Sequence, residues 1–162
     1  MEIAKHDLQD AFEVTDLGEP NKIVGIEITQ NQEQKKITIT QTKYMEAILE
    51  KYGLQDACPV CTPLDSHVKL KPSEPESRNQ NNNYVCLIGS LMYAAVATRP
   101  DIAFAVNRLT LFTANPMMCH WTATKHVLRH LKGAKDTVIV YSKSTEDVAT
   151  KIHFIGYSNV SL

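Results

Sequence analysis

The 162-residue chain has no apolar run of the roughly 18 residues that a membrane-spanning helix requires. Its first residues do not follow the pattern of a basic segment and then an apolar one that marks a secretory signal. From these two absences we expect an intracellular protein, cytoplasmic or nuclear, that makes no membrane contact. Its four cysteines are then expected to be reduced thiols.

A basic excess is also missing, since the formal net charge is −1. Proteins that bind nucleic acid unaided usually carry such an excess, because positive side chains displace counterions from phosphates. Basic residues nevertheless gather between residues 120 and 135, where no acid occurs. They are Lys125, Arg129, Lys132 and Lys135. This local cluster permits contact with nucleic acid but does not require it.

The spacing of residues suggests no catalytic arrangement. The chain lacks a glycine-rich phosphate loop, and its carboxylates do not form the close pairs that two-metal phosphoryl chemistry needs. Cys58 and Cys61 form a Cys-x-x-Cys pair, but a structural zinc site needs four ligands and no second pair occurs. His126 and His130 would share a helix face, yet basic neighbours oppose a cation there. We therefore predict neither an active site nor a metal site.

The first half of the chain predicts a β-hairpin followed by a helix. Residues 23–29 and 36–40 alternate apolar and polar side chains around a polar turn. Apolar residues at helical spacing predict a helix over 41–52, and Gly53 suits the position just beyond its end. Residues 65–83 are polar and contain two prolines, so we expect a flexible linker.

The second half predicts helices and then strands. Thr98 and Asp101 are spaced as a capping box at the start of a helix whose first turn contains Pro100. The chain as a whole is therefore expected to have an α+β fold. The expected helices cover residues 84–97, 100–112 and 119–132, and the expected strands, joined by a polar turn, cover 137–142 and 151–157.

Several segments, taken together and in order, resemble the polyprotein of copia-type retrotransposons. The resemblance runs from the end of the reverse-transcriptase palm, through thumb and connection, into the first strand of RNase H. It covers nearly the whole chain. The segments include Val24–Ile28, Gln41–Tyr44, Thr62–Asp65, Leu87–Tyr93, Thr98–Val106, Leu128–Gly133 and Gly156–Ser158.

The resemblance implies four regions. Residues 1–64 would form the palm edge, with a hairpin like the primer grip and the helix after it. Residues 65–83 would be the linker, and residues 84–135 the helical thumb and connection. Residues 136–162 would begin an incomplete RNase H-like domain that leaves a short β tail.

The resemblance also implies a nucleic-acid surface. Val24 and Gly25 would correspond to the primer grip, and the helix around Gly89 would lie in the minor groove of the template–primer duplex. Glycine there would let the backbone approach the sugars closely; the alternative is that Gly89 packs against Ile102 or Val106 of the next helix. The remaining candidates are Ser90 and Tyr93 in the groove, with Lys125, Arg129 and Lys132 as phosphate contacts.

Departures from the family's pattern argue against catalysis. The paired palm aspartates of the family would lie upstream of Met1, and Asn159 stands where the first RNase H metal ligand, an aspartate, is expected. The family usually has a basic or polar pair at Val85 and Cys86. We therefore expect a truncated reverse transcriptase that is not an enzyme and needs no cofactor, although the intact family enzyme would need Mg²⁺.

Three partners follow from this interpretation. The first is an RNA–DNA or DNA duplex, bound weakly by the thumb. The second is a protein that supplies the missing palm, as in a split polymerase. In a different class of function, the chain would be a domesticated protein-interaction module that pairs through the strand at 151–157.

Overall fold

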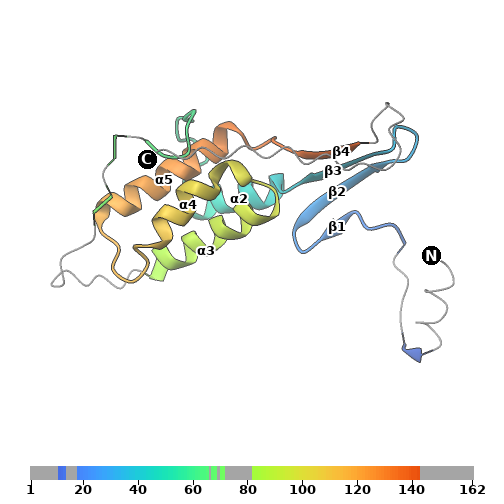
Figure 1. Ribbon diagram of the computed structural model, residues 1–162, viewed down its shortest axis with the longest axis horizontal. Coiled ribbons are helices and arrows are strands. Elements are labelled where there is room, and N and C mark those ends of the chain that lie inside the picture. The colour runs from blue at the N-terminus through green and yellow to red at the C-terminus, as the bar shows by residue number, and fades with distance from the viewer. Residues whose placement is uncertain (1–10, 14–17, 66, 69, 72–81, 143–162) are drawn as a thin grey trace, which may run out of the picture.

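The computed structural model describes residues 11–13, 18–65, 67–68, 70–71 and 82–142. In this part of the chain, four strands form an antiparallel sheet and four α-helices gather at one end of it (Figure 1). The expected α+β class is confirmed. Among the described helices, none is long and apolar enough to cross a membrane.

The sheet has the strand order β1-β2-β3-β4, and the predicted hairpin forms its centre. Its strands are β1 Lys22–Ile23, β2 Ile26–Asn31, β3 Lys36–Thr40 and β4 Ile139–Ser142. The prediction of one strand over residues 23–29 was wrong, because Val24 and Gly25 form a two-residue turn with φ of +50° and +82°. Two positive φ values suit the twist of a tight hairpin, and this turn places Ile23 opposite Ile26.

Strand β4 pairs with β3, with Ile139 opposite Ile39. The second strand predicted for this region, over residues 151–157, lies outside the described residues. The strand assigned to the 136–162 region therefore lies in the same sheet as the hairpin assigned to the 1–64 region. Pairing across about one hundred residues of chain leaves no local sequence signal, so the periodicity of either strand could not reveal it.

The helices contain the hydrophobic core. They are α2 Thr42–Lys51, α3 Asn82–Ala97, α4 Ala103–Thr110 and α5 Met118–Gly133, with the short 3₁₀ helix η1 Pro100–Ile102 before α4. Gly53 has a φ of +63°, which is the left-handed conformation expected just beyond a helix end. Leu87, Leu91, Leu109 and Leu128 are fully buried where these helices meet. Leu70, at the start of the predicted linker, packs against this core, whereas residues 72–81 lie outside the described residues.

The predicted capping box is wrong. The Thr98 hydroxyl donates to the Gln41 side chain at 2.7 Å, and the Asp101 carboxylate accepts two bonds from Arg99 at 2.7 and 2.9 Å. Pro100 disfavours the helical conformation for the residue before it, so Arg99, with φ of −124°, takes the cap position. Burial would raise the pKa of Asp101, but the bonds from Arg99 and His130 outweigh it and lower that pKa.

Candidate nucleic-acid interface

The Val24–Gly25 turn is docked on helix α3. Val24 is 79% exposed at the tip of the turn, and its carbonyl accepts a hydrogen bond from the Tyr93 hydroxyl. A positive φ is costly for a β-branched residue, so the conformation of Val24 depends on contacts that hold the turn in place. Tyr93 provides such a contact from the helix.

Two tyrosines and Ser90 complete this junction. The rings of Tyr44 and Tyr93 meet edge to face at 5.2 Å, and the Tyr44 hydroxyl donates to the Ser90 carbonyl at 3.2 Å. The structure thus brings together the predicted residues Val24, Gly25, Ser90 and Tyr93. Tyr44, in the helix predicted over residues 41–52, was not among the predicted site residues. The hydroxyl of its side chain was the signal that it could bond to another element.

The hydroxyls of Ser90 and Tyr93 already have partners in the main chain. The Ser90 hydroxyl donates to the Cys86 carbonyl at 3.0 Å, one turn earlier in α3. The Tyr93 hydroxyl donates to Val24. These residues therefore shape the junction, and any contact with a ligand would use their remaining exposed atoms.

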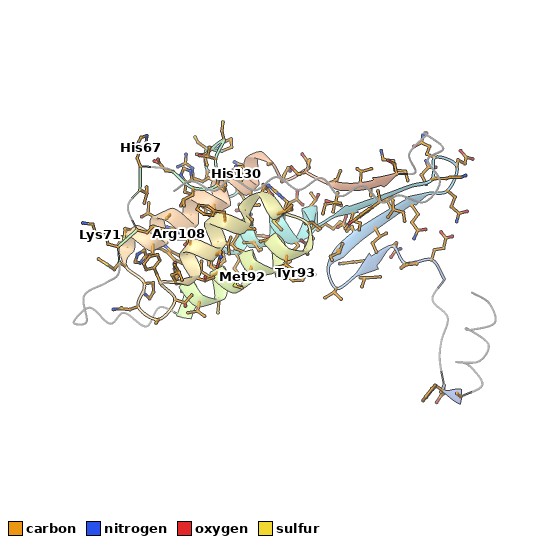
Figure 2. The ribbon with its side chains drawn as sticks, viewed as in Figure 1. His67, Lys71, Met92, Tyr93, Arg108 and His130 are labelled. Atoms are coloured by element: carbon orange, nitrogen blue, oxygen red, sulfur yellow. The ribbon has the colours of Figure 1, made fainter. Side chains whose placement is uncertain are left out.

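Gly89 lies open on the surface of α3. A Cβ atom added there would meet no atom within 4 Å, which contradicts the alternative that Gly89 packs against Ile102 or Val106. Its exposed neighbours on the same helix are Val85, Met92 and Val96, and α3 contains no charged residue. Figure 2 shows Met92 and Tyr93 on the same side of the helices. The result is an uncharged strip with a gap at its centre.

Helix α5 uses its basic and histidine side chains to hold the segment that follows α2. Each of four side chains contacts a main-chain carbonyl of this segment, so together they form a clasp around residues 57–62. The contacts are Lys132 Nζ to Ala57 at 2.8 Å, Arg129 Nε to Cys58 at 2.6 Å, His130 Nδ1 to Val60 at 3.3 Å and His126 Nε2 to Thr62 at 2.9 Å.

The predicted site residues fall into two groups, the basic residues of α5 and the residues at the junction of the Val24–Gly25 turn with α3. Arg129 and Lys132 each direct one donor to a carbonyl of the clasped segment, whereas Lys125 is exposed, with its ammonium 5.6 Å from the centre of the Trp121 ring. In Figure 2, His130 of the clasp lies on the opposite side of the helices from Met92 and Tyr93. Arg129 and Lys132 are thus engaged in the clasp, away from the α3 strip.

The thiols of Cys58 and Cys61 are exposed beside the clasp. Within the described part of the chain, no three side chains of histidine, cysteine or carboxylate type are grouped as a metal site would require. Asn159 lies outside the described residues.

Comparison with known proteins identifies relatives of this chain. The retrovirus-related Pol polyprotein from transposon TNT 1-94 of Nicotiana tabacum is 39% identical over 146 residues, covering 86% of this chain and 11% of that polyprotein. The corresponding polyprotein from transposon RE2 of Arabidopsis thaliana is 32% identical over 136 residues and is covered over 9% of its length. An uncharacterized mitochondrial protein of Arabidopsis thaliana is 33% identical over 127 residues, or 51% of its length.

No protein-family model and no solved structure matches the chain. The transposon polyproteins match over most of this chain, in agreement with the motifs found in the sequence. The chain spans only about a tenth of their length. Over most of its length the chain is homologous to one segment of the retrovirus-related Pol polyproteins of copia-type transposons.

Proposed function

We propose that this chain is the part of a copia-type reverse transcriptase that holds the template–primer duplex, and that it catalyses neither polymerisation nor RNA cleavage itself. The observation that carries the proposal is the junction of the Val24–Gly25 turn with α3, beside the open Gly89. The two segments that resemble the primer grip and the thumb helix are thereby joined in one surface. A cytoplasmic or nuclear setting remains part of the proposal, since nucleic-acid duplexes occur there.

The chemistry of the α3 strip suits the sugar edges of a groove better than phosphates. The strip has no charged side chain, and the absence of a side chain at Gly89 lets the helix backbone come close to a ligand. Phosphate contacts from lysine and arginine usually supply most of the sequence-independent affinity for duplexes. Because Arg129 and Lys132 of the predicted set are held by the clasp, we expect weak, sequence-blind binding.

Three of the described carboxylates have basic partners, in line with the non-catalytic part of the proposal. Asp101 is bonded to Arg99, Glu27 lies 3.4 Å from Lys43, and Glu46 lies 3.2 Å from Lys135. A carboxylate that is neutralised by a basic side chain is a poor start for a site that must gather two Mg²⁺ ions. Primer extension and hybrid cleavage should therefore be absent with Mg²⁺ or Mn²⁺, and metal-dependent turnover that copurifies with the chain would refute this part.

Duplex binding can be tested by fluorescence anisotropy with a labelled RNA–DNA hybrid at low salt. Gly89→Leu should weaken binding by roughly tenfold or more, because its side chain fills the gap in the strip. The matched control is Ala103→Leu, which adds the same side chain at another exposed helix position. Equal affinity of the two variants, or no binding by the unmodified chain, would refute the proposed surface.

A further inference from the structure

The turn between β1 and β2 has a backbone conformation that its own sequence does not favour. Val24 has a φ of +50° and Gly25 a φ of +82°. Glycine adopts such values readily, whereas a β-branched residue rarely does. Asparagine followed by glycine is the pair that two-residue turns with two positive φ values prefer. The turn therefore needs a contact from outside its own sequence to keep this shape.

The sheet gives the turn little support, and helix α3 gives it more. Strand β1 has only two residues, Lys22 and Ile23, and both are exposed. From α3, the Tyr93 hydroxyl donates to the Val24 carbonyl, across 69 positions of the sequence. Figure 2 shows Tyr93 at the end of the helices that lies nearest the sheet. The helix thus holds the turn through the main chain of Val24.

The Tyr93 side chain is itself held in place. Its ring meets the Tyr44 ring edge to face at 5.2 Å, with an angle of 84° between the two planes. The Tyr44 hydroxyl donates to the Ser90 carbonyl at 3.2 Å, and Ala94, next to Tyr93 along α3, is fully buried. A tyrosine side chain has only two rotatable angles, so a ring packed in this way presents its hydroxyl at one point.

We propose that Tyr93 is a positioning residue for duplex binding, which holds the Val24–Gly25 turn so that the turn and the α3 strip meet the duplex as one surface. The proposal rests on the proposed function of that strip. Gly89 lies four residues before Tyr93 and therefore on the same side of the helix. Val24, which is 79% exposed, is thereby presented next to the open gap at Gly89.

Tyr93 acts in this role through Val24 and not through a contact of its hydroxyl with the duplex. A turn that is already fixed favours binding, because a mobile turn would have to be ordered by the ligand. The expectation from the sequence was instead a direct contact of Tyr93 in the groove. The two roles can be separated, since a positioning role disappears when the turn keeps its shape unaided and a direct contact does not.

Tyr93→Phe tests this role because it removes the hydroxyl and keeps the ring. Hydrogen exchange of the Gly25 and Ile26 amides, measured without nucleic acid, should become roughly fivefold faster, as the loss of one ordinary hydrogen bond implies. Affinity for a labelled RNA–DNA hybrid at low salt should fall by a similar factor, about fivefold. Tyr141→Phe is the matched control, since it removes the same hydroxyl from an exposed tyrosine of β4 and should change neither.

Val24→Asn provides the rescue, because asparagine before Gly25 favours the two positive φ values without outside help. When Tyr93→Phe is added to Val24→Asn, it should change exchange and affinity by less than about twofold. An equal loss of affinity with and without Val24→Asn would overturn the positioning role and make the hydroxyl a direct contact.

Two further results would overturn the inference in different ways. Unchanged exchange in Tyr93→Phe, with hybrid binding by the unmodified chain intact, would refute the positioning role alone. Absence of hybrid binding by the unmodified chain would refute the duplex surface and this role together. Helical circular dichroism of every variant guards against unfolding, because the core lies in the helices.

Discussion

The helices and the sheet of this chain are built on different principles. Every residue of the hydrophobic core cluster belongs to a helix, while every described strand residue remains at least partly exposed. The sheet is attached through continuous chain and a few polar contacts, such as Tyr93 to Val24 and Lys43 to Glu27. Stability therefore resides in the helices, and the sheet depends on its attachment to them.

The largest expected effect is on the helical side of this comparison. Leu87→Ala removes a fully buried side chain, and such changes cost about 2–5 kcal/mol of the free energy of unfolding. Ile39→Ala in the sheet should cost about 1 kcal/mol, because its side chain is already partly exposed. Denaturant unfolding monitored by helical circular dichroism measures both.

Equal costs for the two substitutions would mean that the sheet contributes to the same cooperative core, contrary to the division drawn from burial. Thr122→Ala, an exposed position on α5, serves as a control and should change stability by less than about 0.5 kcal/mol.

A smaller, pH-dependent effect is expected from His120 in the helical core. Its Nδ1 accepts the Met117 amide at 2.9 Å, so the ring proton resides on Nε2, which donates to the Lys71 carbonyl at 3.0 Å. Burial lowers the pKa of His120, and the bond to Lys71 only partly opposes this. The unfolded chain therefore binds a proton more readily than the folded one.

This difference sets the direction in which the stability of the fold changes with pH. The stability contributed by neutral His120 should be complete above its unfolded pKa of about 6.5 and should be lost as the pH falls through its lower folded pKa. The loss of stability can be measured by chemical denaturation at pH values from about 8 down to about 4, in steps of about half a pH unit. His120→Gln cannot take up a proton in this range and should have a flatter profile; an unchanged profile would count against the assignment.

The smallest expected effect on stability comes from substituting two glycines that lie in helices. Gly89→Ala should raise stability by up to about 1 kcal/mol, because alanine favours a helix and the added Cβ meets open space. Gly133→Ala should lower stability, because its Cβ would lie 3.0 Å from Cβ of Pro59 in the clasped segment. The melting temperature should rise for Gly89→Ala and fall for Gly133→Ala. A rise for both variants would mean that the segment around Pro59 moves aside at little cost.

The sequence predicted the elements well where the signal is local. Helix α2 ends one residue before the expected limit, and α5 covers its expected range to within a residue at each end. Predictions from local spacing failed where other residues bonded to the polar atoms concerned. Thr98 and Asp101 have the spacing of a capping box, but Gln41 and Arg99 take their polar atoms. A pattern of two-residue period also continued through Val24 and Gly25, which concealed the turn.

The candidate site was less predictable because its parts come from distant segments. The resemblance selected Val24, Ser90 and Tyr93, and the structure places them together, yet nothing in the sequence indicated that Tyr93 would bond to the Val24 carbonyl. Positive charge on one helix suggested phosphate contacts. Arg129 and Lys132 instead donate to carbonyls of a segment some seventy residues earlier, a pairing that charge counting cannot reveal. The assignment of a nucleic-acid surface remains a prediction.

The clasp of α5 has a consequence for how this chain tolerates change. Its four bonds end on main-chain carbonyls, which every amino acid possesses, so the helix holds its neighbour without reading which side chains it carries. Cys58 and Cys61 can therefore drift to other residues while the segment keeps its course. The helix side has less freedom, because exchanging Arg129 or Lys132 for a residue without a side-chain donor removes a bond. The segment at residues 57–62 is therefore open to neutral variation, whereas the contacting positions of α5 are constrained.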